Sequence, residues 1–352
     1  MKLIIQVPCL NEAEHLPATL RELPRSLEGF DAVEWLVIDD GSTDATVEVA
    51  RREGVDHVVR LTNHKGLASA FQAGLDAALK LGADVIVNTD ADGQYRAADI
   101  PVLVAPILKG EADMVVGDRE VHNLERFSAR KKRLQRLGSW VVRRASGTTV
   151  PDTTSGFRAY NREAALQLQV VSKFTYTLES LIQAGKMLVA VDHVPISSRE
   201  EEVRPSRLHT GNFGYVRRSV PTIFRIYATY EPLRVFSAMA IVLFFAALAA
   251  WTPFFIDMVR GQGTGHLQSI ILGGVLMIAA VQVFAVGILA DQIGHQRALT
   301  QRALERVRRI ELHLGVAPSH YEPGNPPQGN SGNLPPSASS GSPDPAAQTP
   351  GE

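Results

Sequence analysis

The chain has 352 residues, a length that allows one large domain or two of ordinary size. Its 36 Lys and Arg residues nearly balance 37 Asp and Glu residues, for a formal net charge of -1. This balance argues against a nucleic-acid-binding protein that works by bulk electrostatics. Cys9 is the only cysteine, which excludes an internal disulfide framework and any metal site built from several cysteines.

The first third of the chain alternates short β-rich apolar runs with helical patterns. Strands are expected at 3–7, 35–39, 57–61, 84–88 and 113–117, and helices at 12–27, 43–53, 67–81 and 100–108. Ser42 or Thr43 is the expected N-cap of the second helix. The alternation predicts an α/β domain with a mostly parallel sheet, helices on both faces, and ligands beyond the carboxyl ends of the strands. The first residues do not resemble a signal peptide, so this domain is expected in the cytoplasm.

Two long uncharged segments follow, at 235–256 and 267–290. At about 1.5 Å per residue, each can cross a hydrocarbon layer of roughly 30 Å, which predicts two transmembrane helices. The alternative is a pair of core helices in a soluble domain. Arginines are frequent on both flanks, whereas Arg260 is the one arginine in the connection, so the positive-inside rule predicts a small outside loop and two cytoplasmic flanks.

Composition therefore divides the chain into five parts. A catalytic domain is expected at 1–204, amphipathic juxtamembrane helices at 205–234, and the membrane hairpin at 235–290. An arginine-rich amphipathic helix is expected at 291–315, with Leu304, Val307, Ile310 and Leu314 on one face, which suits a partner helix or a second copy in a homo-oligomer. The segment 316–352 holds nine of the 20 prolines and is expected to be disordered.

Polar clusters stand where three predicted strands end. Pro8, Asn11 and Glu12 follow the first strand, IDDGSTD (38–44) ends the second, and NTDADGQ (88–94) ends the fourth. No GxGxxG or Walker motif is present, which argues against a dinucleotide-binding or P-loop domain. Side chains two residues apart in extended chain point to one side, so Asp90 and Asp92, followed by Gln94, suit a hard divalent cation such as Mg²⁺ or Mn²⁺. Taken singly, each cluster could be an ordinary turn or loop.

Together these motifs resemble a known family. PCLNE (8–12), DDGSTD (39–44), DADGQ (90–94), GDR (117–119) and DTTSGFRAY (152–160) are similar to the inverting glycosyltransferases of family 2, and more narrowly to the polyprenyl-phosphate branch that includes the dolichol-phosphate mannosyltransferases. The membrane hairpin matches the bacterial subgroup. The resemblance implies a GT-A fold, a nucleotide-sugar donor (GDP-mannose or a UDP-hexose), Mg²⁺ or Mn²⁺, and a polyprenyl phosphate acceptor at the cytoplasmic face of the cell membrane.

The resemblance also implies roles for individual residues. The expected nucleotide-sugar-binding residues are Pro8, Leu10, Glu12, Ile38, Asp40, Ala91 and Arg119. Asp92 and Gln94 are the expected direct metal ligands, with Asp90 on the sugar or on a metal-bound water. Asp90, Asp92 and Arg119 are the expected catalytic residues.

Lys131, Arg158 and Arg207 are the expected contacts of the acceptor phosphate, although the chain departs from the family pattern near two of them. Lys131 and Gln135 stand where the family has Arg and Ser, and the loop around Arg207 lacks the family's glycine. Lys131 could instead belong to a solvated basic helix face, and Arg158 could belong to a structural turn.

Two other functions remain open at this point. A family 2 enzyme acting on a hydroxyl acceptor would need a base-bearing ED pair and a QxxRW-type motif, and neither is found in 160–234. A non-enzymatic membrane scaffold would be expected to have lost the acidic cluster, whereas Asp90, Asp92 and Gln94 are all present.

Overall fold

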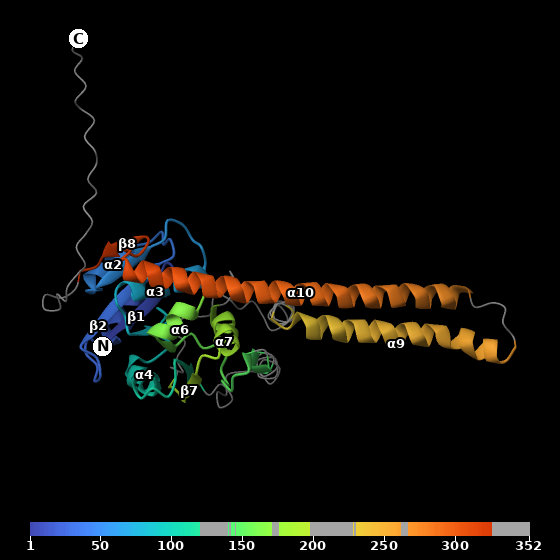
Figure 1. Cartoon of the computed structure of the whole chain (residues 1–352). Helices are drawn as coiled ribbons and strands as arrows, with labels where there is room; N and C mark the ends of the chain where they lie inside the picture. The colour runs from blue at the N-terminus through green and yellow to red at the C-terminus, as the bar shows by residue number, and fades with distance from the viewer. Residues whose placement is uncertain are drawn as a thin grey trace, which may run out of the picture.

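The computed structural model describes residues 1–119, 140, 142–144, 146–170, 176–197, 228, 230–261 and 267–325. An α/β domain contains the N-terminal part, and two long helices extend away from it side by side (Figure 1). The strands are β1 (Lys2–Cys9), β2 (Ala32–Asp39), β3 (His57–Arg60), β4 (Val85–Asn88), β5 (Met114–Asp118), β6 (Arg158–Asn161), β7 (Val191–Pro195) and β8 (Tyr321–Pro323). The helices are α1 (Leu16–Glu22), α2 (Thr46–Arg52), α3 (Leu67–Lys80), η1 (Ala97–Asp99), α4 (Ile100–Leu108), α6 (Arg162–Gln167), α7 (Tyr176–Lys186), α9 (Pro232–Val259) and α10 (Leu267–His313).

The strands form one mixed sheet in the order β7-β5-β6-β4-β1-β2-β3-β8. The central strands β4, β1, β2 and β3 are parallel, β5 is parallel to β7, and β6 and β8 are antiparallel to their neighbours. The five strands predicted from apolar runs are confirmed to within about three residues at their ends, and the mostly parallel sheet is confirmed. Because β1, β2 and β4 are parallel neighbours, the loops that follow them lie at one edge of the sheet.

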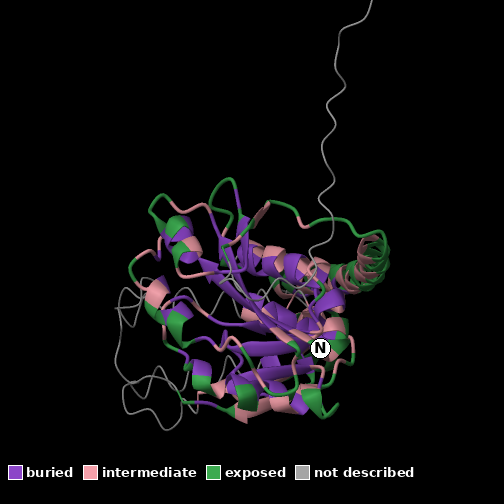
Figure 2. Cartoon of the chain, turned by 90° about the vertical axis from the view of Figure 1, so that its left-hand side faces the viewer, coloured by how far each residue is buried: buried purple, intermediate pink, exposed green. Residues whose placement is uncertain are grey.

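Side chains alternate between two hydrophobic cores, one on each face of the sheet. In β1, Ile4 packs with α3, α6 and α7, whereas Leu3 and Ile5 pack with α1, α2 and α4. Strands β1 to β6 are buried over most of their length, whereas the edge strands β7 and β8 are partly exposed (Figure 2). Cores on both faces make the sheet a rigid base for the loops at its carboxyl edge.

The predicted cap of the second helix is wrong. Helix α2 begins at Thr46 with Ala45 as its N-cap and no side-chain cap. Ser42 Oγ instead accepts a hydrogen bond from the Asn11 amide (2.9 Å), and the Thr43 amide donates to Asn11 Oδ1 (2.8 Å). The two residues therefore join the loops after β1 and β2 and do not start the helix.

Helices α9 and α10 are long and apolar enough to cross a membrane. Only 11% and 17% of their most apolar windows are buried, so the two helices do not form a buried core pair within this chain, as the alternative required. Glycines let the two helices approach closely, since a Cβ atom on Gly273 would lie 2.1 Å from Trp251 and one on Gly287 would lie 2.7 Å from Phe236.

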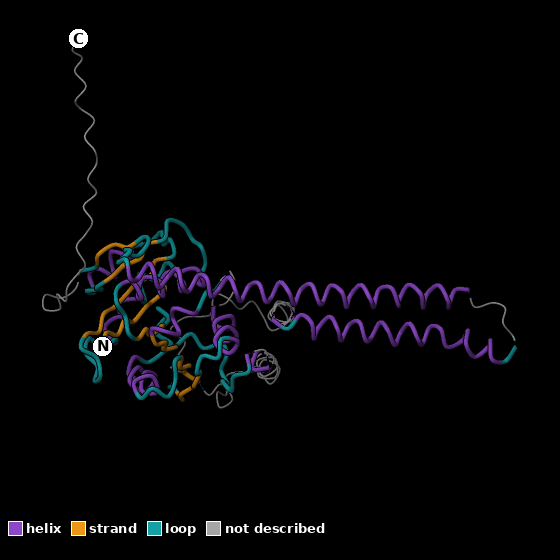
Figure 3. Tube along the Cα trace, in the orientation of Figure 1, coloured by secondary structure: helices purple, strands orange, loops and turns teal. Residues whose placement is uncertain are grey.

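The expected boundary between the second span and a separate helix at 291–315 does not exist, because α10 is one continuous helix of 47 residues (Figure 3). No proline interrupts it, and its C-terminal part docks on the α/β domain. Arg308 donates to the carbonyls of Leu166 and Leu168 (3.3 and 2.8 Å), and Glu311 pairs with Lys80 at 3.1 Å. The predicted apolar face, represented by Val307 and Ile310, remains exposed.

The expectation of disorder from residue 316 is wrong for its first ten residues. After α10 the chain turns back, and Tyr321–Pro323 forms β8, antiparallel to β3. Tyr321 Oη lies 3.1 Å from His57 Nδ1, and Glu322 pairs with Arg51. Side-chain partners in the α/β domain thus hold this short strand at the sheet edge, and the rest of the predicted tail lies outside the described residues.

Candidate active site

The loops after β1 and β2 are joined by backbone-to-side-chain hydrogen bonds. Asn11, in the left-handed region at φ 52°, bonds to Ser42 and Thr43, and the Glu12 amide donates to Thr46 Oγ1 (3.0 Å). This contact brings the PCLNE and DDGSTD motifs together, as the sequence predicted. Leu10 is partly exposed beside them, while Glu12 is buried.

Asp40 organises a third loop, which the motifs did not reveal. Its carboxylate accepts hydrogen bonds from the amides of Lys65 (2.8 Å) and Gly66 (2.9 Å), and His64 Nδ1 lies 2.8 Å from Asp40 Oδ2. Gly66, at φ 96°, is the residue before α3. The glycine before an apolar helix was the available sequence signal, but only the structure shows that Asp40 holds this loop.

Three further residues expected to bind the nucleotide sugar are buried. Pro8 and Ala91 are buried, and the Ile38 side chain belongs to the core on the α3 face. The Ile38 side chain therefore packs in the core beneath the sheet edge that carries Asp40, and it has no exposed surface to offer a ligand.

The acidic loop follows β4, and its carboxylates lie close enough to influence each other. Asp92 Oδ1 accepts a hydrogen bond from the Gln94 amide (3.1 Å), and the Ala91 carbonyl accepts one from Thr19 Oγ1 (2.9 Å). Burial and the neighbouring charge of Asp92 raise the pKa of Asp90 to about 7. Negative charge at this place is thus incompletely compensated by the protein.

Two carboxylates and an amide oxygen are hard donors of the kind that Mg²⁺ and Mn²⁺ prefer, so the donor set fits a divalent cation. Within the part of the chain that the structure describes, no group of three or more His, Cys, Asp or Glu side chains gathers to hold a metal. The loop therefore suits a cation that is shared with a bound ligand better than a closed structural metal site.

Arg119 lies at the end of β5 and faces the segment before β6. It donates to both carboxylate oxygens of Asp152 (2.7 and 3.2 Å) and to Thr154 Oγ1 (3.0 Å). Burial alone would raise the pKa of Asp152, but the Arg119 guanidinium outweighs it and holds this pKa below its usual value. The Arg119 side chain keeps 22% of its surface exposed, so it is not fully enclosed by the protein.

The structure buries Arg158, which the sequence predicted to contact the acceptor phosphate. Its side chain is fully buried, and its nitrogens donate to Ser155 O (2.8 Å), Thr153 O (3.0 Å), Thr177 O (2.8 Å) and Ser180 Oγ (2.9 Å). The guanidinium is thus occupied in fixing the turn before β6, which was the structural alternative. Lys131 and Arg207, the other two predicted acceptor contacts, lie outside the described residues.

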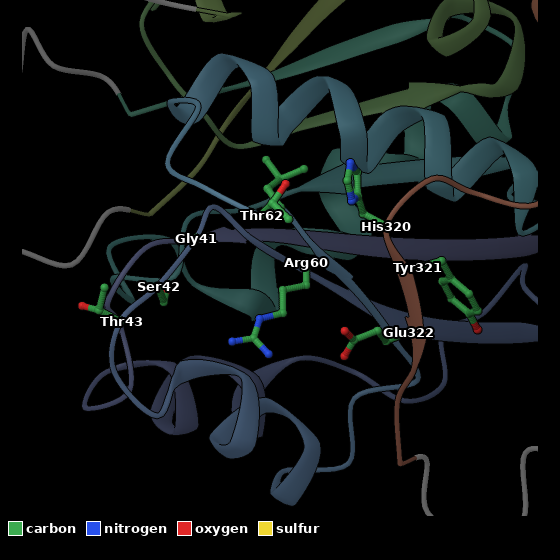
Figure 4. Close-up of a pocket in the computed structure, with 9 residues that line it drawn as sticks. Gly41, Ser42, Thr43, Arg60, Thr62, His320, Tyr321 and Glu322 are labelled. Atoms are coloured by element: carbon green, nitrogen blue, oxygen red, sulfur yellow. The ribbon is translucent and has the colours of Figure 1, made fainter.

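A cavity of about 560 Å³ lies beside the DDGSTD turn, between the turn, β3 and β8 (Figure 4). It is lined by Gly41, Ser42, Thr43, Arg60, Leu61, Thr62, His320, Tyr321 and Glu322. None of the predicted catalytic or metal-binding residues borders it. The cavity therefore lies next to the candidate site without containing its acidic loop.

Parallel strand ends that carry acidic loops, joined to a membrane-capable hairpin, fit a sugar-transferring enzyme of the GT-A class, and the family matches show that class. Residues 4–168 match Glycosyl transferase family 2, and residues 231–296 match the GtrB C-terminal hairpin. The chain belongs to glycosyltransferase family 2, and it is a hexosyltransferase.

Similar proteins agree with this assignment. An uncharacterized glycosyltransferase of Mycobacterium bovis is 39% identical over 184 residues, which are 51% of this chain and 78% of that protein. An undecaprenyl-phosphate mannosyltransferase of Micrococcus luteus is 29% identical over 244 residues, 66% of this chain and 98% of that protein. Glucosyl-3-phosphoglycerate synthase from Mycobacterium tuberculosis, solved with Mn²⁺, uridine diphosphate and phosphoglyceric acid, superposes with a TM-score of 0.50 at 22% identity, covering 64% of this chain and 78% of that one. The predicted family and GT-A fold are confirmed.

Proposed function

We propose that the protein transfers a sugar from a nucleotide-sugar donor to a polyprenyl phosphate at the cytoplasmic face of the membrane, with inversion at the anomeric carbon. The observation that carries this proposal is the combination of the Asp90–Asp92 loop at the sheet edge with two exposed apolar helices in one chain. The similarity to an undecaprenyl-phosphate mannosyltransferase supports the same acceptor class.

Asp92, Gln94 and Asp90 would hold Mg²⁺ or Mn²⁺. Bound there, the cation would neutralise charge that grows on the leaving nucleoside diphosphate. The crystal structure of the similar synthase contains Mn²⁺ and uridine diphosphate, which supports this assignment at the level of the fold. Asp40 and the loops that it joins would receive the nucleoside, and the partly exposed Arg119 side chain would contact a phosphate.

The acceptor needs little help from a general base, because a phosphate monoester oxygen is already anionic near neutral pH. The protein's task is then to position the two substrates and to stabilise charge. The pair of Arg119 and Asp152 suits this task because it fixes the guanidinium at the end of β5. Lys131 and Arg207 remain proposed contacts of the acceptor phosphate.

The membrane arrangement follows from the same proposal. Helices α9 and α10 would both cross the bilayer, which leaves the catalytic domain and the C-terminus in the cytoplasm. A polyprenyl phosphate stays in the bilayer, so this anchor would keep the enzyme beside its acceptor. The exposed face with Leu304, Val307, Ile310 and Leu314 would suit a second copy of the chain.

A transfer assay tests the proposal. Purified full-length protein is incubated with Mg²⁺ or Mn²⁺, undecaprenyl phosphate and a panel of labelled nucleotide sugars that includes GDP-mannose and UDP-hexoses. Label from one donor is expected in the organic-extractable product. Transfer to a sugar hydroxyl with none to the lipid phosphate would favour the hydroxyl-directed alternative, and no transfer from any donor would favour a scaffold.

Asp92→Ala is expected to lower the rate of lipid-linked product formation at least about a hundredfold, because a direct ligand of the cation is lost. Asp192→Ala, which removes an exposed carboxylate from β7 at the far edge of the sheet, serves as the matched control and should transfer normally. An Asp92→Ala protein as active as the control would disprove the metal-assisted mechanism.

A further inference from the structure

Gly156, in the segment before β6, has both of its backbone groups bonded to residues at the two ends of the acidic loop. Its amide donates to Tyr95 Oη (2.9 Å), and its carbonyl accepts from Asn88 Nδ2 (2.8 Å). Asn88 precedes the loop and Tyr95 follows it. The loop that carries Asp90 and Asp92 is therefore fastened at both ends to one glycine.

The same glycine lies directly against Asp90. A Cβ atom at position 156 would lie 3.0 and 3.1 Å from the two carboxylate oxygens of Asp90, and 2.7 Å from Tyr176 Oη. Tyr176 cannot withdraw easily, because it is buried and its ring stacks on Phe71 with centroids 4.2 Å apart. The position of the Gly156 backbone thus limits where the Asp90 carboxylate can lie.

Further contacts make this arrangement rigid. Asn88 is fully buried, and its Oδ1 accepts from Gln6 Nε2 (2.8 Å). The ring of Tyr95 stacks on Phe157, with centroids 5.2 Å apart and planes at 12°. Arg158, the next residue in the chain after Phe157, makes four hydrogen bonds that hold the turn before β6.

We propose that Tyr95 and Gly156 are positioning residues for Asp90: the Tyr95 hydroxyl holds the Gly156 backbone against the Asp90 carboxylate, which sets the direction in which Asp90 faces the divalent cation and the donor sugar. This inference rests on the proposed function. It also connects Arg119 to the acidic loop through the segment before β6, because Arg119 is bonded to Asp152 and Thr154 in that same segment.

Tyr95→Phe removes the hydroxyl and keeps the ring that stacks on Phe157. The matched control is Tyr321→Phe, which also removes one tyrosine hydroxyl bond, to His57 at the edge of the sheet. For both full-length variants and the wild type, Mn²⁺ affinity is measured by electron paramagnetic resonance in the presence of UDP or GDP, together with kcat, the donor KM and the thermal midpoint.

Tyr95→Phe is expected to weaken Mn²⁺ binding and to lower kcat by about tenfold each, as one buried hydrogen bond permits, while the donor KM changes less than about twofold. Tyr321→Phe should match the wild type in Mn²⁺ affinity and kcat. Gly156→Ala provides a second, independent change, because its methyl group pushes on Asp90 even though Tyr95 is intact; it should weaken Mn²⁺ binding at least as much.

Wild-type Mn²⁺ affinity and kcat in folded Tyr95→Phe would overturn this inference and leave the proposed function standing. Tyr95→Phe could also lose activity only because its thermal midpoint is lower, while its folded fraction binds Mn²⁺ normally. That result would overturn the inference as well. Absence of Mn²⁺ binding in the wild type would instead contradict the proposed metal site itself.

Discussion

Asp90 is partly accessible to solvent, and yet its carboxylate is enclosed by Gly156 and lies near the charge of Asp92. The sequence predicted the acidic pair, because two carboxylates two residues apart follow a buried strand. It did not predict Asn88, Tyr95 or Tyr176 as supports of the loop. The role of each depends on a distance to Gly156 that the sequence does not contain.

The raised pKa of Asp90 predicts a pH-dependent stability in protein freed of metal by EDTA. The folded state binds this proton with a pKa of about 7, whereas an unfolded Asp has a pKa near 3.9. The stabilising contribution is therefore complete below pH ~4 and is lost as the pH rises toward ~7. Thermal midpoints should fall across this window more steeply in the wild type than in Asp90→Asn, and parallel curves for the two proteins would contradict the assigned titration.

Helix α10 shows what pattern reasoning predicts at the scale of an element and what it misses. Apolar length predicted the membrane-capable part, and spacing predicted the amphipathic part. Their fusion into one helix was missed because a change in composition was taken as a change in structure. Strand β8 was missed because a proline-rich segment is rarely ordered, and here the pairing with β3 is decided by partners distant in sequence.

Arg308→Met is expected to lower the unfolding free energy of the docked domain by about 1–2 kcal/mol. The partly buried Arg308 side chain donates to two carbonyls at the end of α6, and both would be left without this donor. Arg306→Met, an exposed change on the same helix, is the control and should fall within about 0.5 kcal/mol of the wild type. Equal denaturation midpoints for the two variants would show that the docking bond adds no stability.

At the scale of the whole molecule, the α/β domain and the hairpin are connected by the helix itself and by its docking contacts. The sheet order, the two cores and the exposed hairpin could largely be predicted, because strand alternation and hydrocarbon length are local properties. The docking of α10 on α6 and on Lys80 could not be predicted, since it depends on a few long-range polar contacts.

The unbroken α10 has a mechanical consequence. At about 1.5 Å per residue its 47 residues measure roughly 70 Å, far more than the roughly 30 Å of hydrocarbon. If α10 crosses the bilayer as proposed, it should tilt when bilayer thickness changes, and the α/β domain docked on its C-terminal part should move with it. Vesicles of dimyristoyl, dioleoyl and dierucoyl phosphatidylcholine should then give different turnover with a lipid acceptor, while Mn²⁺ affinity stays constant. The length of the acyl chains in the host membrane would thus set how far from the bilayer surface the enzyme transfers the sugar.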